Sequence, residues 1–237
     1  MPTASEALSE TWTNGLAPTD WLDNPAPDCP VCLAKESRSF ATVEHQQYWR
    51  CERCVATFLE PGQRLDGKAE KAHYDLHQNE VEDAGYRQFL NRLAKPLLER
   101  LAARQAGLDY GCGPGPALAE LMREAGHTMT LWDPMYAPHA AALETRYDFI
   151  TCTEVLEHLY QPAESFAHMI ALLKPGGWLG IMTTLQTDDA RFANWHYRRD
   201  PTHVVFYRAE TLRWLADHHD CTIEFPATNV ALIQRKR

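Results

Sequence analysis

The chain has 237 residues, 45% of them hydrophobic, and a formal net charge of −9. That is enough apolar material for one core with an appended module. A general nucleic-acid binder needs a basic face, so the charge argues against nucleic acid as a partner without excluding it. No apolar run approaches about 18 residues, and residues 1–15 lack the basic and apolar parts of a signal peptide. We therefore expect no membrane partner and a cytoplasmic protein.

The N-terminal quarter carries two pairs of cysteines behind a polar arm. Residues 1–26 are polar and contain several prolines, which predicts a flexible arm. Residues 27–62 contain two Cys-x2-Cys pairs, Cys29 with Cys32 and Cys51 with Cys54. This spacing supplies four thiolates for a tetrahedral zinc ion and predicts a zinc ribbon with a β-hairpin between the pairs. Such a zinc would be structural, because no coordination position stays open for chemistry.

Residues 63–106 have a helical pattern in two parts and form a predicted helical linker. In the second part Leu90, Leu93 and Leu97 recur at helical spacing. Pro96 lies inside this pattern and predicts a kink or a break.

A glycine-rich loop follows an apolar run that ends at Asp109. The loop contains Gly111, Cys112, Gly113 and Gly115. A helical pattern begins at Ala117, so the order is strand, glycine loop, helix, and the loop amides would face a ligand. A P-loop would need Lys and Ser or Thr after its last glycine, and Pro116 also breaks the dinucleotide fingerprint.

Three further segments continue an alternating α/β pattern. Residues 128–133 form a short strand that ends at Asp133, followed by Pro134. Residues 147–159 indicate a buried strand running into a helix, with Thr153 and Glu154 near the junction. Residues 166–184 indicate a helix, a Gly-Gly turn and a strand. The stretch between the first two segments is too short for a helix and another strand.

Asp109 and the three glycines form D-x-G-x-G-x-G, which resembles motif I of class I S-adenosylmethionine (SAM) dependent methyltransferases. The later segments resemble further motifs of that superfamily, of the methyltransferase-23 and ubiquinone-methyltransferase kind. The resemblance implies a Rossmann-like, mostly parallel sheet over residues 107–237, with a final antiparallel strand and one strand short or missing. A helix in residues 63–106 would form a lid, for which Tyr74, His77 and Tyr86 are candidates. SAM would contact Asp109, Gly111, Cys112, Gly113, Gly115, Asp133, Pro134, Thr153 and Glu154. The usual adenine-contacting acid has no counterpart, and Met135 and Tyr136 are the substitutes.

Glu154, Glu157 and His158 form E-x-x-E-H, and on a helix the first and last would share a face. With a later histidine, such as His203, the phrase resembles a divalent-metal motif of ubiquinone-pathway O-methyltransferases and of plant small-RNA 2′-O-methyltransferases. It also occurs in methyltransferases without a metal. A second metal on these four residues, and a catalytic role for Glu154 with His158 or His203 as general base, both stay open.

Residues 192–207 occupy the position of the superfamily's substrate loop and are rich in aromatic, histidine and arginine side chains. The candidate substrate contacts are Trp195, His196, Tyr197, Arg198, Arg199 and Tyr207. The aromatic rings would sandwich a ring, and the arginines would hold a phosphate or carboxylate.

These features predict a SAM-dependent methyltransferase acting on a small molecule, either sugar-linked or phenolic, with a structural zinc near the N-terminus. Some sugar C-methyltransferases also combine a four-cysteine module with a SAM domain. One alternative is a metal-assisted O-methyltransferase of RNA or quinol type. The other is a non-catalytic interaction protein that combines a zinc ribbon with a SAM-binding fold.

Overall fold

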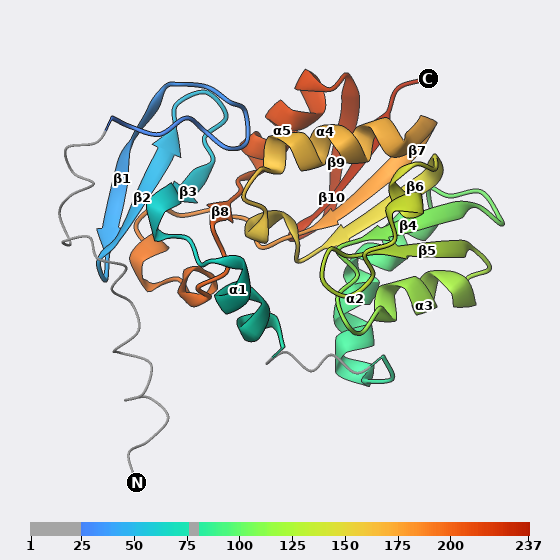
Figure 1. Ribbon diagram of the computed structural model, residues 1–237. Coiled ribbons are helices and arrows are strands. Elements are labelled where there is room, and N and C mark those ends of the chain that lie inside the picture. Colours follow the sequence, from blue (N-terminus) through green and yellow to red (C-terminus); the bar gives the residue numbers. More distant parts are fainter. Residues whose placement is uncertain (1–24, 76–80) are drawn as a thin grey trace, which may run out of the picture.

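The computed structural model describes residues 25–75 and 81–237, and the predicted arm at residues 1–26 lies almost entirely outside them. A six-stranded and a four-stranded sheet lie side by side (Figure 1). No helix in the described part of the chain is long and apolar enough to cross a membrane.

The large sheet has the strand order β5-β4-β6-β7-β10-β9. Its strands are β4 (Ala106–Tyr110), β5 (Thr128–Trp132), β6 (Tyr147–Thr153), β7 (Leu173–Met182), β9 (Cys221–Ala227) and β10 (Val230–Arg235). The first four are parallel to one another, and β10 runs antiparallel to both of its neighbours. This is the predicted Rossmann-like methyltransferase sheet, including its final antiparallel strand.

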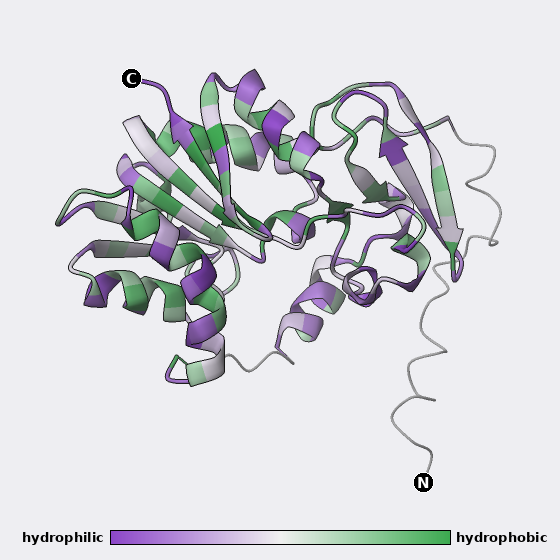
Figure 2. Ribbon diagram, turned by 180° about the vertical axis from the view of Figure 1, so that it is seen from behind, coloured by the Kyte–Doolittle hydropathy of each residue, from purple (hydrophilic) through white to green (hydrophobic). Residues whose placement is uncertain are grey.

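Helices cover both faces of the large sheet. They are α2 (Ala84–Leu98), α3 (Ala117–Glu124), α4 (Pro162–Leu172) and α5 (Ala209–His218). On one face α2 and α3 bury Leu93 and Met122 against Phe149 of β6. On the other face α4 and α5 bury Phe166 and Leu212. Apolar residues accordingly line the strands, whereas the outer helix surfaces are hydrophilic (Figure 2).

The trimmed edge of the sheet is confirmed. Between β5 and β6 the chain forms only a 3-10 turn, η2 (Ala140–Leu143), so β5 is an edge strand. The described part of the helical region contains two helices, and the second does not break at Pro96. A short helix α1 (Gly67–Tyr74) is capped by Asp66, and the longer α2 contains Pro96 and ends two residues after it.

The small sheet contains β1 (Ser37–Val43), β2 (Gln46–Cys51), β3 (Thr57–Leu59) and β8 (Val205–Phe206), in that order. The first two form the predicted hairpin. Its two-residue turn, Glu44–His45, has φ angles of 50° and 70°, as a type I′ turn requires. The fourth strand, β8, comes from the segment between β7 and α5, roughly 145 residues further along the chain.

The two sheets share one hydrophobic core. Phe58 of β3 and Phe206 of β8 belong to the same buried cluster as Leu108 of β4 and Ile150 of β6. The small sheet therefore packs as part of the main body, and the carboxyl ends of the parallel strands face it (Figure 1).

Candidate active site and four-cysteine site

The glycine loop leaves β4 at the place where the strand order reverses, between β4 and β6. Gly111 has φ 78°, and a Cβ there would lie 2.5 Å from Cγ2 of Val155. Gly113 has φ 61°, but the space around it is open. Gly111 therefore lets the loop pack against the end of β6, whereas Gly113 presents bare backbone to the crevice where ligands bind in open α/β sheets.

Asp133 ties the glycine loop to the chain after β5. Its Oδ2 accepts from the amide of Gly113 at 3.1 Å, and its Oδ1 accepts from Met135 and Tyr136 at 2.8 and 3.0 Å. A carboxylate has about four acceptor sites, so Asp133 keeps capacity for one further donor such as a sugar hydroxyl. Pro134 is exposed beside it.

Asp109 lies beneath the loop rather than on its surface. Its carboxyl accepts from Thr151 Oγ1 at 2.7 Å, and burial raises its pKa to about 6. Burial likewise raises the pKa of the half-buried Cys112 thiol to about 12, so that thiol is neutral at physiological pH. At the end of β6 the hydroxyl of Thr153 is buried without a hydrogen-bond partner in the described part of the chain. Buried polar groups are normally paired, so this hydroxyl fits a bound ligand.

Glu154 follows β6 in a left-handed conformation, with φ 51°. Its amide donates to the carbonyl of Met182 at 2.8 Å, which holds it at the strand end. The residues after it form the 3-10 turn η3 (Leu156–His158) and not a helix. The expectation that Glu154 and His158 share a helical face is therefore wrong.

Glu157, His158 and His203 offer ligand atoms that lie within 4.8 Å of one another. Glu157 is fully buried and accepts from Thr183 at 2.9 Å and from the hydroxyl of Tyr197. The Nδ1 atoms of His158 and His203 lie 3.2 and 2.7 Å from the carbonyls of Thr202 and Tyr197. We assign the proton to Nδ1 in both rings, which leaves each Nε2 as the acceptor atom.

The four residues predicted for a second metal are thus only partly together. Glu154 is absent from the group of three, although its carboxylate lies 3.5 Å from the hydroxyl of Tyr197, which also contacts Glu157. Burial, reinforced by the charge of Glu157, raises the pKa of Glu154 to about 8. Burial also lowers the pKa of His203. This centre therefore contains at least one neutral carboxyl and a neutral imidazole at physiological pH.

The predicted substrate loop divides into exposed and buried side chains. His196 and Arg199 are exposed and Trp195 is half-buried, so these three are accessible. The buried members are Tyr197, Arg198 and Tyr207. The hydroxyl of Tyr207 donates to the carbonyl of Leu156 at 3.0 Å.

Arg198 is paired with the small sheet. Its Nη2 lies 2.9 Å from Glu44, and its Nη1 donates to Gln46 and Tyr48 at 3.1 and 3.2 Å. Its charge is thus paired with a carboxylate of the chain itself and its side chain is buried, so Arg198 is poorly placed to bind a substrate anion.

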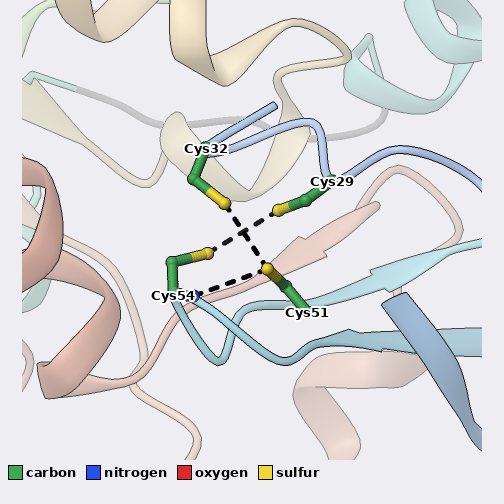
Figure 3. Close-up of side chains that lie close together, drawn as sticks. All are labelled: Cys29, Cys32, Cys51 and Cys54. Atoms are coloured by element: carbon green, nitrogen blue, oxygen red, sulfur yellow. Dashed lines mark hydrogen bonds between the residues drawn. The ribbon is translucent and has the colours of Figure 1, made fainter. Parts of the chain in front are cut away.

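The four cysteines point toward a common centre (Figure 3). Cys29 and Cys54 have their sulfurs 3.6 Å apart, and Cys32 and Cys51 have theirs 3.4 Å apart. All four sulfurs lie within 4.8 Å of one another. Four thiolates about 2.3 Å from a tetrahedral zinc ion would be separated by just under 4 Å, so the donor set fits that ion.

The backbone around the two cysteine pairs repeats closely. The amides of Cys29 and Cys51 donate to the carbonyls of Ala34 and Ala56 at 2.8 and 2.9 Å. The residue after each pair has a positive φ, 58° for Leu33 and 56° for Val55. A left-handed conformation is costly for a β-branched residue such as Val55, and such strain persists where the surrounding structure imposes it.

Residues 69–224 match the family model described as a methyltransferase domain, which is more than half of the chain. The chain belongs to this methyltransferase family. A curated relative is the ubiquinone biosynthesis O-methyltransferase of Proteus mirabilis, 33% identical over 95 residues, covering 40% of this chain and 39% of the relative. That of Vibrio parahaemolyticus is 36% identical over 100 residues, covering 32% of this chain and 42% of the relative. The chain thus spans about two fifths of these relatives.

Two solved methyltransferase structures are also similar. The 1,6-didemethyltoxoflavin-N1-methyltransferase of Burkholderia thailandensis has a TM-score of 0.47 and 16% identity, with coverage of 85% of this chain and all of that chain. The magnesium protoporphyrin IX methyltransferase of Synechocystis has a TM-score of 0.48 and 14% identity, with coverage of 72% and 92%.

The methyltransferase match starts after the four cysteines. Several contacts within the candidate site have no motif in the sequence. Thr183 donates to Glu157 from the end of β7. The ring of Tyr74 in α1 lies edge-on to His158, with centroids 5.3 Å apart. The hydroxyl of Tyr136 donates to Asp75 at 2.8 Å, which links the end of α1 to the loop after β5. The only sequence signal for these contacts is the predicted lid, for which Tyr74 is one of three candidates; His77, another of them, lies outside the described residues.

Proposed function

We propose that this protein is a SAM-dependent methyltransferase that methylates a hydroxyl oxygen of a small molecule. One observation carries the proposal. The glycine crevice and the pair His158–His203 lie at the same carboxyl edge of the sheet, because Val155 both packs on Gly111 and begins the turn that ends at His158. A methyl donor and a proton acceptor would therefore meet at one place.

Each part of the crevice has a role in holding SAM. The bare backbone at Gly113 allows close approach, Asp133 accepts from the ribose hydroxyls, and Thr153 supplies its unpaired hydroxyl. Asp109 lies beneath the loop, where its hydrogen bond with Thr151 supports the loop without touching SAM. SAM, when bound, supplies a methyl group on a positively charged sulfur, and Glu154 borders that position.

The transfer needs positioning and the removal of one proton. The acceptor oxygen would take the methyl group as the carbon–sulfur bond breaks, with S-adenosylhomocysteine as the leaving group. The hydroxyl proton passes to Nε2 of His203 or His158, whose Nδ1 atoms are fixed by backbone carbonyls. Most of the acceleration comes from holding the two reactants in line. Trp195, His196 and Arg199 are the accessible candidates for contact with the acceptor.

We further propose a structural zinc ion at Cys29, Cys32, Cys51 and Cys54. A second divalent ion on Glu157, His158 and His203 is the other function that the centre supports, because one carboxylate and two imidazole nitrogens suit such an ion. The ion would orient the acceptor hydroxyl and lower its pKa. The resemblance to ubiquinone-pathway O-methyltransferases supports a phenolic acceptor.

Calorimetry with S-adenosylhomocysteine on zinc-replete protein tests the cofactor, and transfer of labelled methyl groups to a panel of catechols and other hydroxylated metabolites tests the reaction. Asp133→Ala should abolish cofactor binding. His203→Gln should keep it and lose turnover. A wild-type protein that binds neither SAM nor its product would overturn the proposal and favour a non-catalytic role. Product formed from RNA but from no small molecule would overturn the substrate class.

A further inference from the structure

The short strand β8 connects the four-cysteine module to the reaction centre. It pairs antiparallel with β3, with Thr57 opposite Phe206 and Phe58 opposite Val205. β3 begins three residues after Cys54, the last of the four cysteines. Here the four-cysteine module means residues 27–62. The strand that completes its sheet thus belongs to the predicted substrate loop.

Val204 fixes the loop from both sides. Its carbonyl accepts from the amide of Leu59 in β3 at 2.9 Å, and its amide donates to the carbonyl of Glu157 in η3 at 2.8 Å. Val204 is fully buried. The backbone next to His203 is therefore held between the module and the E-x-x-E-H turn by two hydrogen bonds that are protected from water.

His203 and Tyr197 depend on the same stretch of backbone. The Nδ1 of His203 donates to the carbonyl of Tyr197, and the two rings lie 4.1 Å apart between centroids. The hydroxyl of Tyr197 donates to Glu157 and lies 3.5 Å from Glu154. A shift of this loop would move the imidazole and both carboxyl contacts together.

Arg198 is a second anchor, next to Tyr197. It is 2% exposed, and its Nη atoms contact Glu44, Gln46 and Tyr48 in the module, while Nη2 also donates to the carbonyl of Ala193 in the loop at 3.2 Å. Arg50 of β2 also makes a 2.7 Å ion pair with Asp189, three residues before that loop. Three separate connections thus join the module to the segment between β7 and α5.

We propose that the four-cysteine module is a positioning element of the reaction centre, which sets the place of His203 and Tyr197 through β8 and through Arg198. This inference rests on the proposed methyltransferase function for its kinetic consequence only. The positioning of His203 can be measured without turnover. Under this inference the four-cysteine module supports catalysis within this chain and does not serve to bind another protein.

The first test compares two arginines of the module region. Arg198→Met removes an anchor to the loop. Arg53→Met removes an exposed ion pair with Glu36 inside the module and serves as the matched control. Carbon-13 histidine labelling gives an imidazole signal for His203, assigned with His203→Gln. We expect Arg198→Met to shift the His203 signal in the cofactor-bound protein, and Arg53→Met to leave it in place.

Kinetics separate positioning from substrate contact. Arg198→Met should lower kcat by about tenfold or more, since small misplacements of reacting groups are costly, while S-adenosylhomocysteine affinity stays within about twofold. Arg198→Lys should recover part of kcat, and Glu44→Gln should lower it less than Arg198→Met does. A rise in KM alone, with the His203 signal unmoved, would identify Arg198 as a substrate contact and overturn the inference.

Metal removal provides an independent readout. Chelation of the zinc-replete protein should move the His203 signal in the same direction as Arg198→Met does. If chelation unfolds the whole chain, the comparison of Arg198→Met with Arg53→Met still tests whether the module positions His203. An unmoved His203 signal in folded Arg198→Met protein refutes the inference. Loss of cofactor binding in the wild type would instead count against the proposed function, and the His203 signal would still report on positioning.

Discussion

Gly111→Ala should destabilise the protein and weaken its binding of S-adenosylhomocysteine, and Val155→Ala should partly restore both. A Cβ at Gly111 would lie 2.5 Å from Cγ2 and 2.9 Å from Cγ1 of Val155. Neither distance occurs in real structures, so the loop or the valine must move. Val155 is β-branched and stiff, and it lies next to Glu154, so its movement would disturb the end of β6.

Two contributions set the magnitude of this effect. The backbone of Gly111 has φ 78°, and placing alanine in the left-handed region costs about 1–2 kcal/mol. Overpacking a closed contact adds about 1–3 kcal/mol. Together they predict a loss of about 2–5 kcal/mol in the free energy of unfolding, most of it from strain next to the cofactor crevice.

Gly113→Ala is the matched control, because Gly113 also has a positive φ, 61°, but nothing lies within 4 Å of the place that a Cβ would occupy. It should lose only the conformational part, about 1–2 kcal/mol. Urea denaturation measures the free energies, and calorimetry measures binding of S-adenosylhomocysteine. The double variant Gly111→Ala with Val155→Ala should recover the steric part and keep the conformational part.

The reasoning fails if the two glycine variants lose equal stability, because the clash with Val155 would then contribute nothing. It also fails if Val155→Ala adds its own cost to that of Gly111→Ala without any recovery. In either case Gly111 would be needed for its backbone angle alone.

Three further predictions concern charge, metal and the reaction centre. Burial raises the pKa of Asp109 from 3.8 to about 6. The stability that comes from the neutral Asp109 carboxyl is therefore complete below pH 3.8 and is lost as pH rises through 6. Urea denaturation of cofactor-free protein should show wild type losing up to about 3 kcal/mol relative to Asp109→Asn between pH 4 and 7, and parallel pH curves would contradict this. Elemental analysis should find one zinc per chain that Cys51→Ser removes; a second metal equivalent that survives would favour the ion at Glu157, His158 and His203. Tyr197→Phe leaves buried Glu157 without one donor, which should cost about 1–3 kcal/mol in denaturation and lower kcat at unchanged cofactor affinity, and an unchanged kcat would refute its role.

The large sheet could be predicted from the sequence because its signals are local. The glycine loop follows its strand directly, and the missing strand follows from the short stretch between Asp133 and Tyr147. The hairpin between the cysteine pairs follows from their spacing. Each of these depends on residues within about two dozen positions of one another, where spacing limits the backbone to few conformations.

β8 could not be predicted, since two residues carry no periodicity. Val205 and Phe206 read equally well as loop residues, and the partner strand β3 has only three residues. Their pairing is decided by the shared core around Phe58 and by the two hydrogen bonds of Val204. Such non-local contacts have no counterpart in single-sequence patterns.

In the candidate site, the sequence identified the residue types but did not determine where their side chains lie. The E-x-x-E-H motif identifies the candidate metal ligands. However, Glu154 has a left-handed backbone conformation that turns the chain before η3 and separates its carboxyl from Glu157 and His158. Arg198 was a reasonable anion ligand by residue type, yet the hairpin turn at Glu44 supplies a carboxylate that the substrate would otherwise provide. The buried guanidinium takes the carboxylate that can reach it, here the exposed Glu44, because an unpaired buried charge is costly. The side chains of a functional loop therefore divide into those that meet the ligand and those that hold the loop, and only the fold of the distant hairpin determines which is which.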